Sequence, residues 1–318
     1  MKSIDLVASG YCSLDHIIKI KSKAKVGQTS IVTNKDNRKI YYGGCNVNVA
    51  YALAKLNKNA MPIIRVGDDY KSTEFKAYLE ASGINLDGIG YVEDAHTSGA
   101  YLIEDDTSNH ITLFYPGAMS ETYVHEYKDT WFKNTKMALM TVASKKDNEV
   151  FFNQCIKYDV PLYFGVKMDK DAFPKSFLKT IIKGITGIFM NENEAECLVD
   201  LFDIDYIINL FDIAPKLDLI VITKGKQGSL AYHKQSEGIE SIASGIVKTD
   251  NFVDAVGSGD AYIAGFMYGL LNKSSIKTCM HYGATLSSFA IEGMGATSNL
   301  PTKKEFLDKY NLLEMGDL

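Results

Sequence analysis

The chain has 318 residues, of which 46% are hydrophobic and only 6 are proline, so we expect an ordered globular protein with a large core. The net charge is −5 and lysines are interspersed with acids, which argues against nucleic acid as a partner. No run of about 18 apolar residues is present, so we expect no membrane association.

The cysteines are widely spaced and form no C-x-x-C pair. They are Cys12, Cys45, Cys155, Cys197 and Cys279. This pattern is typical of free thiols in a reducing compartment. The N-terminal segment is too short and too acidic for the apolar region of a signal peptide. We therefore expect a cytoplasmic protein.

Taken in chain order, short apolar runs alternate with helical patterns along most of the sequence. Strands are predicted at 4–9, 62–67, 137–143, 161–165, 186–190 and 218–223. Helices are predicted from the glycine turn at 43–44 to residue 56, and at 71–82, 147–158, 173–182, 193–201 and 204–213. Such alternation indicates an α/β fold with a mostly parallel sheet and helices on both faces. Ligands bind such sheets at the carboxyl ends of the strands.

Two further groups of segments have alternating apolar and charged residues, which suits strands covered on one face only. They lie at 14–20 and 29–42, and at 98–104 and 110–115. We predict that residues 13–42 and 96–117 form a small β-sheet lid over the ligand-binding edge. Residues 1–12, 43–95 and 118–318 would then form the α/β domain.

Residues 254–260 read Asp-Ala-Val-Gly-Ser-Gly-Asp and lead directly into the apolar segment 261–271. The glycines would lie at the N-terminus of a buried helix, where free N–H groups and the helix dipole favour a phosphate. Asp260 lies in the same turn. A carboxylate there suits a general base that takes a proton from a hydroxyl attacking phosphorus.

Other glycine-rich sites fit this segment less well. The dinucleotide fingerprint G-x-G-x-x-G fails because Tyr262 occupies the third glycine position. The P-loop pattern G-x-x-x-x-G-K-[ST] does not occur in the chain. The remaining alternative is a structural loop that leads into a core helix.

Four motifs, in this order, resemble those of the ribokinase-like (PfkB) family of carbohydrate and nucleoside kinases. They are Gly43-Gly44-x-x-x-Asn48-x-Ala50, Asn191-Glu-Asn-Glu194, Thr223-Lys-Gly225-Lys-Gln-Gly228 and Asp254-x-x-Gly257-x-Gly259-Asp260. Segments 41–44, 221–229 and 295–301 are most similar to the archaeal broad-specificity nucleoside kinases of this family. The resemblance covers essentially the whole chain and implies an ATP-dependent kinase with a ribokinase-like fold and a β-lid.

For the catalytic end, the resemblance implies that Asp260 is the general base toward the acceptor hydroxymethyl group. The backbone N–H groups of Gly257, Ser258, Gly259 and Asp260 would form the anion hole. Asp254 would help to bind a monovalent cation or order the metal site.

For the nucleotide end, Asn191 and Glu194 follow an apolar strand, where a hydrated Mg²⁺ would sit with the phosphates of ATP. An exposed helix cap is the alternative reading of the same two residues. Thr223, Gly225 and Gly228 follow the next strand, so that their hydroxyl and backbone would approach the nucleotide. A plain β-turn is the alternative there.

For the acceptor, the resemblance implies that the carboxylate of Asp15 accepts hydrogen bonds from sugar hydroxyls. Asn48 and the backbone of Gly43 and Gly44 would hold the same ring. Two aromatic residues of the predicted lid, Tyr101 and Phe114, would stack on a base, although packing within the lid is the more common use of such side chains.

Two positions depart from the family pattern. Ser13 stands where a ribokinase proper carries Asn, which argues against free ribose as the acceptor. Phe164-Gly165-Val166-Lys167 stands where the family often has Asp after an apolar strand, so the resemblance does not imply the usual contribution of this position to the phosphate end.

The leading hypothesis is ATP-dependent phosphorylation of the 5′-hydroxymethyl group of a nucleoside. The alternative keeps the chemistry and changes the acceptor to a free sugar or sugar acid, as in a ribokinase, fructokinase or ketodeoxygluconate kinase. A third hypothesis is a nucleotide or nucleoside sensor without catalysis. A homodimer through the lid would cover its open strand edge. The base preference and the phosphate donor are not set by the motifs.

Overall fold

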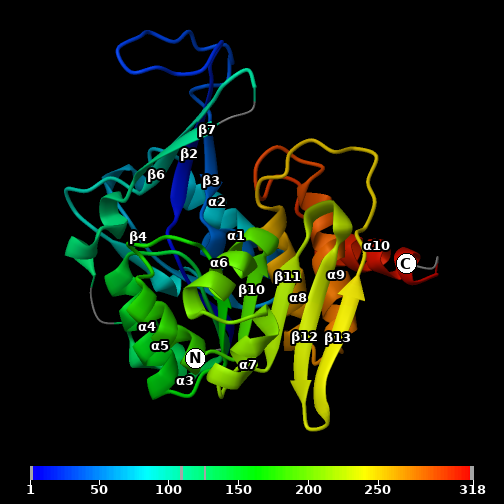
Figure 1. The fold of residues 1–318 in the computed structure, drawn as a ribbon. Helices are drawn as coiled ribbons and strands as arrows, with labels where there is room; N and C mark the ends of the chain where they lie inside the picture. Colours follow the sequence, from blue (N-terminus) through cyan, green and yellow to red (C-terminus); the bar gives the residue numbers. More distant parts are fainter. Residues whose placement is uncertain (1–2, 108–109, 125–126, 316–318) are drawn as a thin grey trace.

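The computed structural model describes residues 3–107, 110–124 and 127–315 of the chain. A nine-stranded sheet forms its centre, with the strands in the order β13-β12-β11-β10-β9-β8-β1-β4-β5 (Figure 1). The strands are β1 (Ile4–Ser9), β4 (Ala60–Val66), β5 (Ile89–Tyr91), β8 (Thr135–Met140), β9 (Leu162–Gly165), β10 (Gly187–Asn191), β11 (Leu219–Thr223), β12 (Ser229–Gln235) and β13 (Gly238–Ser244). All neighbours from β5 to β11 are parallel, whereas β12 and β13 are antiparallel additions at one edge.

Helices cover both faces of this sheet because alternate side chains of each buried strand point to opposite sides. In β1, for example, Leu6 and Ala8 join one core and Val7 joins the other. The first core also contains residues of α1 (Cys45–Lys55), α2 (Phe75–Ser82), α8 (Ser258–Leu271), α9 (Ile276–Ala290) and α10 (Lys303–Met315). The second contains residues of α3 (Asp129–Lys133), α4 (Lys145–Lys157), α5 (Lys175–Gly184), α6 (Glu192–Phe202) and α7 (Leu210–Ile213). The predicted fold class is confirmed.

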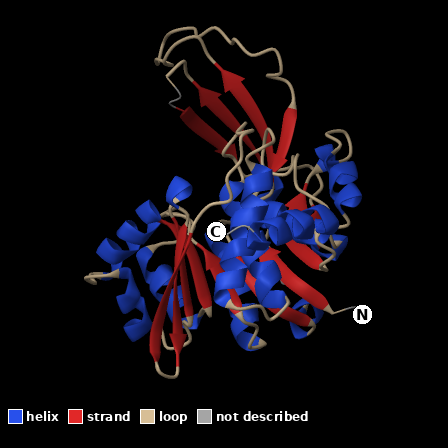
Figure 2. Ribbon diagram, turned by 90° about the vertical axis from the view of Figure 1, so that its right-hand side faces the viewer, coloured by secondary structure: helices blue, strands red, loops and turns tan. Residues whose placement is uncertain are grey.

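A separate four-stranded sheet, called the small sheet below, has the order β3-β2-β6-β7. Its strands are β2 (Ser13–Lys19), β3 (Ile40–Gly43), β6 (Gly99–Glu104) and β7 (His110–Tyr115). Figure 2 shows it standing apart from the helices of the main body. Because β2 follows directly on the end of β1, the small sheet lies beyond the carboxyl edge of the central sheet. The boundaries 13–42 and 96–117 for a lid domain remain a prediction.

The sequence-based prediction was wrong in the segment 29–42, where only Ile40–Gly43 is a strand. The side chain of Asn34 explains the end of the pairing. It accepts a hydrogen bond from the Lys19 amide at 2.9 Å and donates one to the Ile17 carbonyl at 2.9 Å. The Asn34 side chain thus bonds the backbone groups of β2 that a longer β3 would pair with. Beyond this point, a single isolated bridge joins Ile20 and Val32.

Two helices are shorter than predicted. The helix expected at 71–82 begins at Phe75, because Glu74 has a φ of 59° and breaks the helical backbone. The helix expected at 204–213 is a 3-10 turn at Ile207–Asn209 followed by the short α7. Among the residues that the structure describes, none of the helices is both long and apolar enough to span a bilayer.

Candidate active site

The carboxylate of Asp260 lies in the first turn of α8, where it meets the N-terminal turn of α1. Asn48 donates from Nδ2 to Asp260 Oδ2 at 2.8 Å, joining two residues that are 212 positions apart in the chain. The other amide atom, Asn48 Oδ1, is buried and has no hydrogen-bond partner among the described residues. Buried amide oxygens are rarely left unpaired, so this atom is available to a hydroxyl of a bound ligand.

Burial raises the pKa of Asp260, because removal from water disfavours the charged form. The hydrogen bond from Asn48, a second one from the Cys45 thiol, and the positive charge of Lys167 act in the opposite direction. Burial also raises the pKa of the Cys45 thiol well above its usual value, so this thiol stays protonated and donates to the carboxylate. The result is a partly buried carboxylate that is held in place by hydrogen bonds, as a general base requires.

Gly257 caps α8 with a φ of 75°, a left-handed conformation that favours glycine. A Cβ at this position would lie 2.3 Å from the Cβ of Ala296, so a side chain has no room either. Ser258 donates its amide to the Ala255 carbonyl at 3.2 Å within the turn. In the described structure no acceptor pairs with the amides of Gly257, Gly259 and Asp260, which leaves these N–H groups for an anion at the positive end of the helix.

Asp254 fixes the loop that precedes α8. Its Oδ1 accepts from the Val256 amide at 3.1 Å, and its Oδ2 accepts from the Gly295 amide at 3.0 Å. The carboxylate thus ties the turn before α8 to the loop after α9. Its role toward a monovalent cation stays a prediction.

Asn191 and Glu194 lie at the carboxyl end of β10, where they form a capping box for α6. Asn191 Oδ1 accepts from the Glu194 amide, and Glu194 Oε2 accepts from the Asn191 amide, both at 2.9 Å. Burial raises the pKa of Glu194. One carboxylate oxygen is therefore engaged in the cap and the other is left for a ligand.

The neighbouring strand places Thr223 directly beside Asn191 in the parallel register. Gly225, with a φ of 53°, borders open space in the turn that follows. Gly228 closes this turn by accepting from the Lys224 amide at 2.8 Å, and it lies tightly against the carbonyl of Ser244. The structure thus brings these residues to the same edge as Asn191 and Glu194.

No group of three or more His, Cys, Asp or Glu residues within the described ranges is arranged to hold a metal ion. A metal at this edge would therefore take most of its ligands from phosphate oxygens and water, which is the usual preference of Mg²⁺. Glu194 fits such an arrangement through its remaining oxygen.

Asp15 is a half-buried residue of β2, and Ser13 donates a hydrogen bond to its Oδ1. Burial raises the pKa of Asp15. A Cβ on Gly43 would lie 2.8 Å from Asp15 Oδ2, and Gly44, with a φ of 104°, lies against the carbonyl of Tyr11. These close approaches place Asp15 next to the turn that starts α1, and hence on the same side as Asn48 and Asp260.

The small sheet separates the two aromatic residues predicted to bind substrate. Asp15 pairs with Ala100, and Ala100 pairs with Phe114, so Asp15 and Phe114 share one face. The ring of Phe114 lies 4.8 Å from the ring of Tyr11. Tyr101 is one position out of phase and lies on the opposite face, stacked on His16 at 5.2 Å. The structure therefore brings Phe114, but not Tyr101, together with Asp15.

Several residues of this region were not predicted from the sequence. Tyr11 and Lys167 follow the ends of β1 and β9, so their position at the carboxyl edge of the sheet was a usable signal. Cys45 and Tyr41 gave none. Cys45 reaches Asp260 only through the packing of α1 on α8, and Tyr41 contacts Gly295, so that a Cβ there would lie 3.2 Å from its ring.

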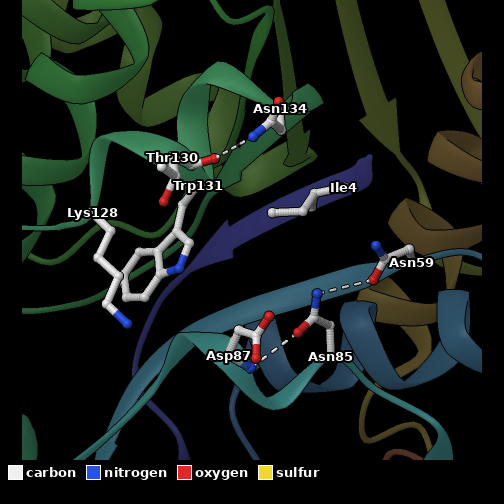
Figure 3. Close-up of a pocket in the computed structure, with 8 residues that line it drawn as sticks. All are labelled: Ile4, Asn59, Asn85, Asp87, Lys128, Thr130, Trp131 and Asn134. Carbon is white, nitrogen blue, oxygen red and sulfur yellow. Dashed lines mark hydrogen bonds between the residues drawn. The ribbon is translucent and has the colours of Figure 1, made fainter. Parts of the chain in front are cut away.

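A separate cavity lies at the amino-terminal edge of the sheet, where Ile4 begins β1 and Asn134 precedes β8 (Figure 3). Its three asparagine side chains are hydrogen-bonded to their neighbours. Asn85 donates to Asn59 Oδ1 at 3.1 Å, and Asn134 donates to the Thr130 carbonyl at 3.2 Å. This cavity is at the opposite end of the strands from Asp260 and takes no part in the site.

Comparison with known proteins decides the family. The model of the pfkB family carbohydrate kinases matches residues 4–303. The chain belongs to the pfkB family. It is therefore a kinase. Its four motifs lie at the carboxyl edge of the central sheet, where the candidate site residues described above are found. The chain is 28% identical to a nucleoside kinase of Methanocaldococcus jannaschii over 309 residues, which cover 94% of each protein.

Two solved structures show that this pfkB kinase has the ribokinase fold. The crystal structure of Methanocaldococcus jannaschii nucleoside kinase, an archaeal member of the ribokinase family, superposes with a TM-score of 0.86 at 24% identity. The match covers 98% of this chain and 100% of that one. A Burkholderia thailandensis nucleoside kinase in complex with inosine gives a TM-score of 0.84 at 21% identity, over 96% and 98% of the two chains.

Replacing Gly257 by alanine should lower the free energy of unfolding by about 1–3 kcal/mol, because the left-handed backbone is strained by a Cβ that also meets Ala296. Gly259→Ala is the matched control. Gly259 borders open space and has no left-handed backbone, so alanine there should be neutral or stabilising by up to about 1 kcal/mol. Urea denaturation of both variants measures the difference, and equal losses would contradict the steric argument.

Proposed function

We propose that this kinase transfers the γ-phosphoryl group of ATP to the 5′-hydroxymethyl group of a nucleoside. The observation that carries the proposal is the Asp260 carboxylate, held by Asn48 in the first turn of α8 beside unpaired amides and next to the face of the small sheet that bears Asp15 and Phe114. The nucleoside kinases to which the chain is similar support the choice of acceptor.

In the proposed reaction, Asp260 accepts the proton of the acceptor hydroxyl as its oxygen attacks the γ-phosphorus. The bond between this phosphorus and the oxygen bridging to the β-phosphorus breaks, and ADP leaves with the electron pair. The amides of Gly257, Gly259 and Asp260 stabilise the charge on the phosphoryl oxygens. Asp260 is active only when deprotonated, so the rate rises as the pH rises through its pKa.

Mg²⁺, when bound with ATP, would neutralise phosphate charge, and Glu194 would hold it through water. Thr223 and Gly225 would line the nucleotide on the neighbouring strand, with Gly228 shaping their turn. We also propose that Asp254 keeps the loop before α8 in the form that can hold a monovalent cation.

The acceptor is proposed to lie between the small sheet and α1. Asp15 would accept hydrogen bonds from ribose hydroxyls, with Asn48 Oδ1 as a second acceptor. The rings of Phe114 and Tyr11 would provide the apolar surface for the base. A free sugar lacks a planar base that could stack on these rings, and this favours a nucleoside over the sugar and sugar-acid alternatives.

We also propose a homodimer through the small sheet. Both β3 and β7 are edge strands, and Ile111, Leu113 and Tyr115 on the outer face of β7 are about half exposed. A pairing subunit would cover this edge and face. Light scattering should then give twice the chain mass of 35.2 kDa; a mass of one chain at micromolar concentration would contradict the dimer.

Asp260→Asn should lower kcat by about 10² to 10⁴, because an amide cannot take the proton, while the affinity for ATP stays nearly unchanged. A coupled assay of ADP formation measures this with adenosine, inosine, cytidine, ribose, fructose and ketodeoxygluconate as acceptors. Turnover with the nucleosides and its loss in the variant are expected. Wild-type turnover with the sugars alone would assign the alternative acceptor, and an unchanged kcat in the variant would remove the mechanism.

Phe114→Ala should raise KM for the nucleoside by roughly tenfold, since stacking of a base on an aromatic ring is worth about 1–3 kcal/mol. Tyr101→Ala removes a comparably exposed ring from the opposite face and should leave KM nearly unchanged. Steady-state kinetics of the two variants decide which face receives the base. A larger effect at Tyr101 than at Phe114 would reverse the assignment.

A further inference from the structure

Lys167 lies at the carboxyl edge of the central sheet, the edge at which Asp260 and Glu194 are also found. It follows the end of β9 by two residues, and the Val166 amide donates to the Phe189 carbonyl of β10 at 2.8 Å. The chain therefore still runs beside β10 as it reaches Lys167. Two residues after Phe189, β10 ends at Asn191 and leads into the turn that carries Glu194.

The same strand end packs against α8. A Cβ on Gly165 would lie 3.6 Å from Cδ1 of Ile263, a residue one helical turn after Asp260. Lys167 thus has α6 on one side and the start of α8 on the other. Its side chain is exposed, and no ion pair joins it to another residue of the described structure.

The positive charge of Lys167 affects the pKa values of three groups, which lie on three separate helices. It lowers the pKa of Asp260 on α8, of Glu194 on α6 and of Cys45 on α1, in each case against the opposing effect of burial. Asp169, in the same loop, donates its amide to the Lys167 carbonyl and uses its own carboxylate for the amides of Asp171 and Ala172. Within the described residues, the Lys167 ammonium group therefore has no ion-paired or hydrogen-bonded partner in its own loop.

A triphosphate that enters between Asp260 and Glu194 brings further negative charge to a place that already holds two carboxylates. Phosphoryl transfer depends on cations at the transferring group, since charge is spread over its oxygens in the transition state. A lysine ammonium on a flexible stem can follow this group as it moves from donor to acceptor.

Resting on the function proposed above, we propose that Lys167 is a catalytic residue that binds the γ-phosphoryl oxygens of ATP during transfer. Its ammonium keeps its protons throughout, and the proton of the acceptor hydroxyl goes to Asp260. The departure from the family pattern at 164–167 then has a function, because this chain presents a cation from the end of β9.

Lys167→Met should lower kcat on the order of 10²-fold, the usual loss for one donor to transition-state charge, with a small change in KM for the nucleoside. Lys167→Arg should recover a large part of the rate. The acid limb of the pH profile of kcat/KM should move to higher pH in Lys167→Met, because the lost charge holds the pKa of Asp260 down. Lys179→Met, on the exposed side of α5, is the matched control and should change none of these.

Calorimetry with Mg²⁺ and a non-hydrolysable ATP analogue, compared with ADP, tests the contact without an acceptor. Lys167→Met should lose about tenfold in affinity for the analogue and keep its affinity for ADP, as expected for a charged contact to the γ-phosphoryl group. Wild-type kcat and analogue affinity in this variant would overturn the proposal. So would a loss of rate that arginine does not restore and that leaves the pH profile unmoved. If the wild type phosphorylates no nucleoside, the proposed acceptor fails while the calorimetric result still decides on Lys167.

Discussion

The site depends on a partly buried carboxylate that lies where the first turns of two helices meet. Asp260 lies in the first turn of α8 and Asn48 in the first turn of α1, so their hydrogen bond exists only when both helices pack on the same face of the sheet. Burial raises the pKa of Asp260, and the amide, the thiol of Cys45 and the charge of Lys167 counteract it. The balance between desolvation and these contacts gives a carboxylate that is basic and yet still ionisable.

The parallel sheet explains why groups far apart in sequence meet at one edge. The ends of β9, β10 and β11 lie side by side, and they carry Lys167, Asn191 and Thr223 respectively. Because neighbouring strands in a parallel sheet end at the same side, each contributes its first loop residues to the same space. The unpaired amides of α8 approach this space from the helical layer, and this placement supports the proposed binding of phosphate there.

The small sheet decides which side chains can reach an acceptor. Its pairing register places Asp15 and Phe114 on one face and Tyr101 on the other, since neighbouring residues of a strand point to opposite sides. The face with Asp15 also bears Tyr41, whose ring lies near Gly295 in the loop tied to Asp254. The small sheet and the loop before α8 are thus connected through the Tyr41 ring, the backbone of Gly295 and the Asp254 carboxylate.

By itself the sequence determined the α/β class, most strands and helices of the central sheet, and the turn around Asp260, because apolar periodicity and glycine spacing are local properties. It did not determine the end of β3, where the side chain of Asn34 replaces backbone pairing, or the faces of Tyr101 and Phe114, which depend on register between strands. The hydrogen bond from the Cys45 thiol to Asp260 and the effect of the Lys167 charge on Asp260 were decided by tertiary structure alone. They arise between elements on different parts of the chain, and no local pattern encodes a distance that only packing sets.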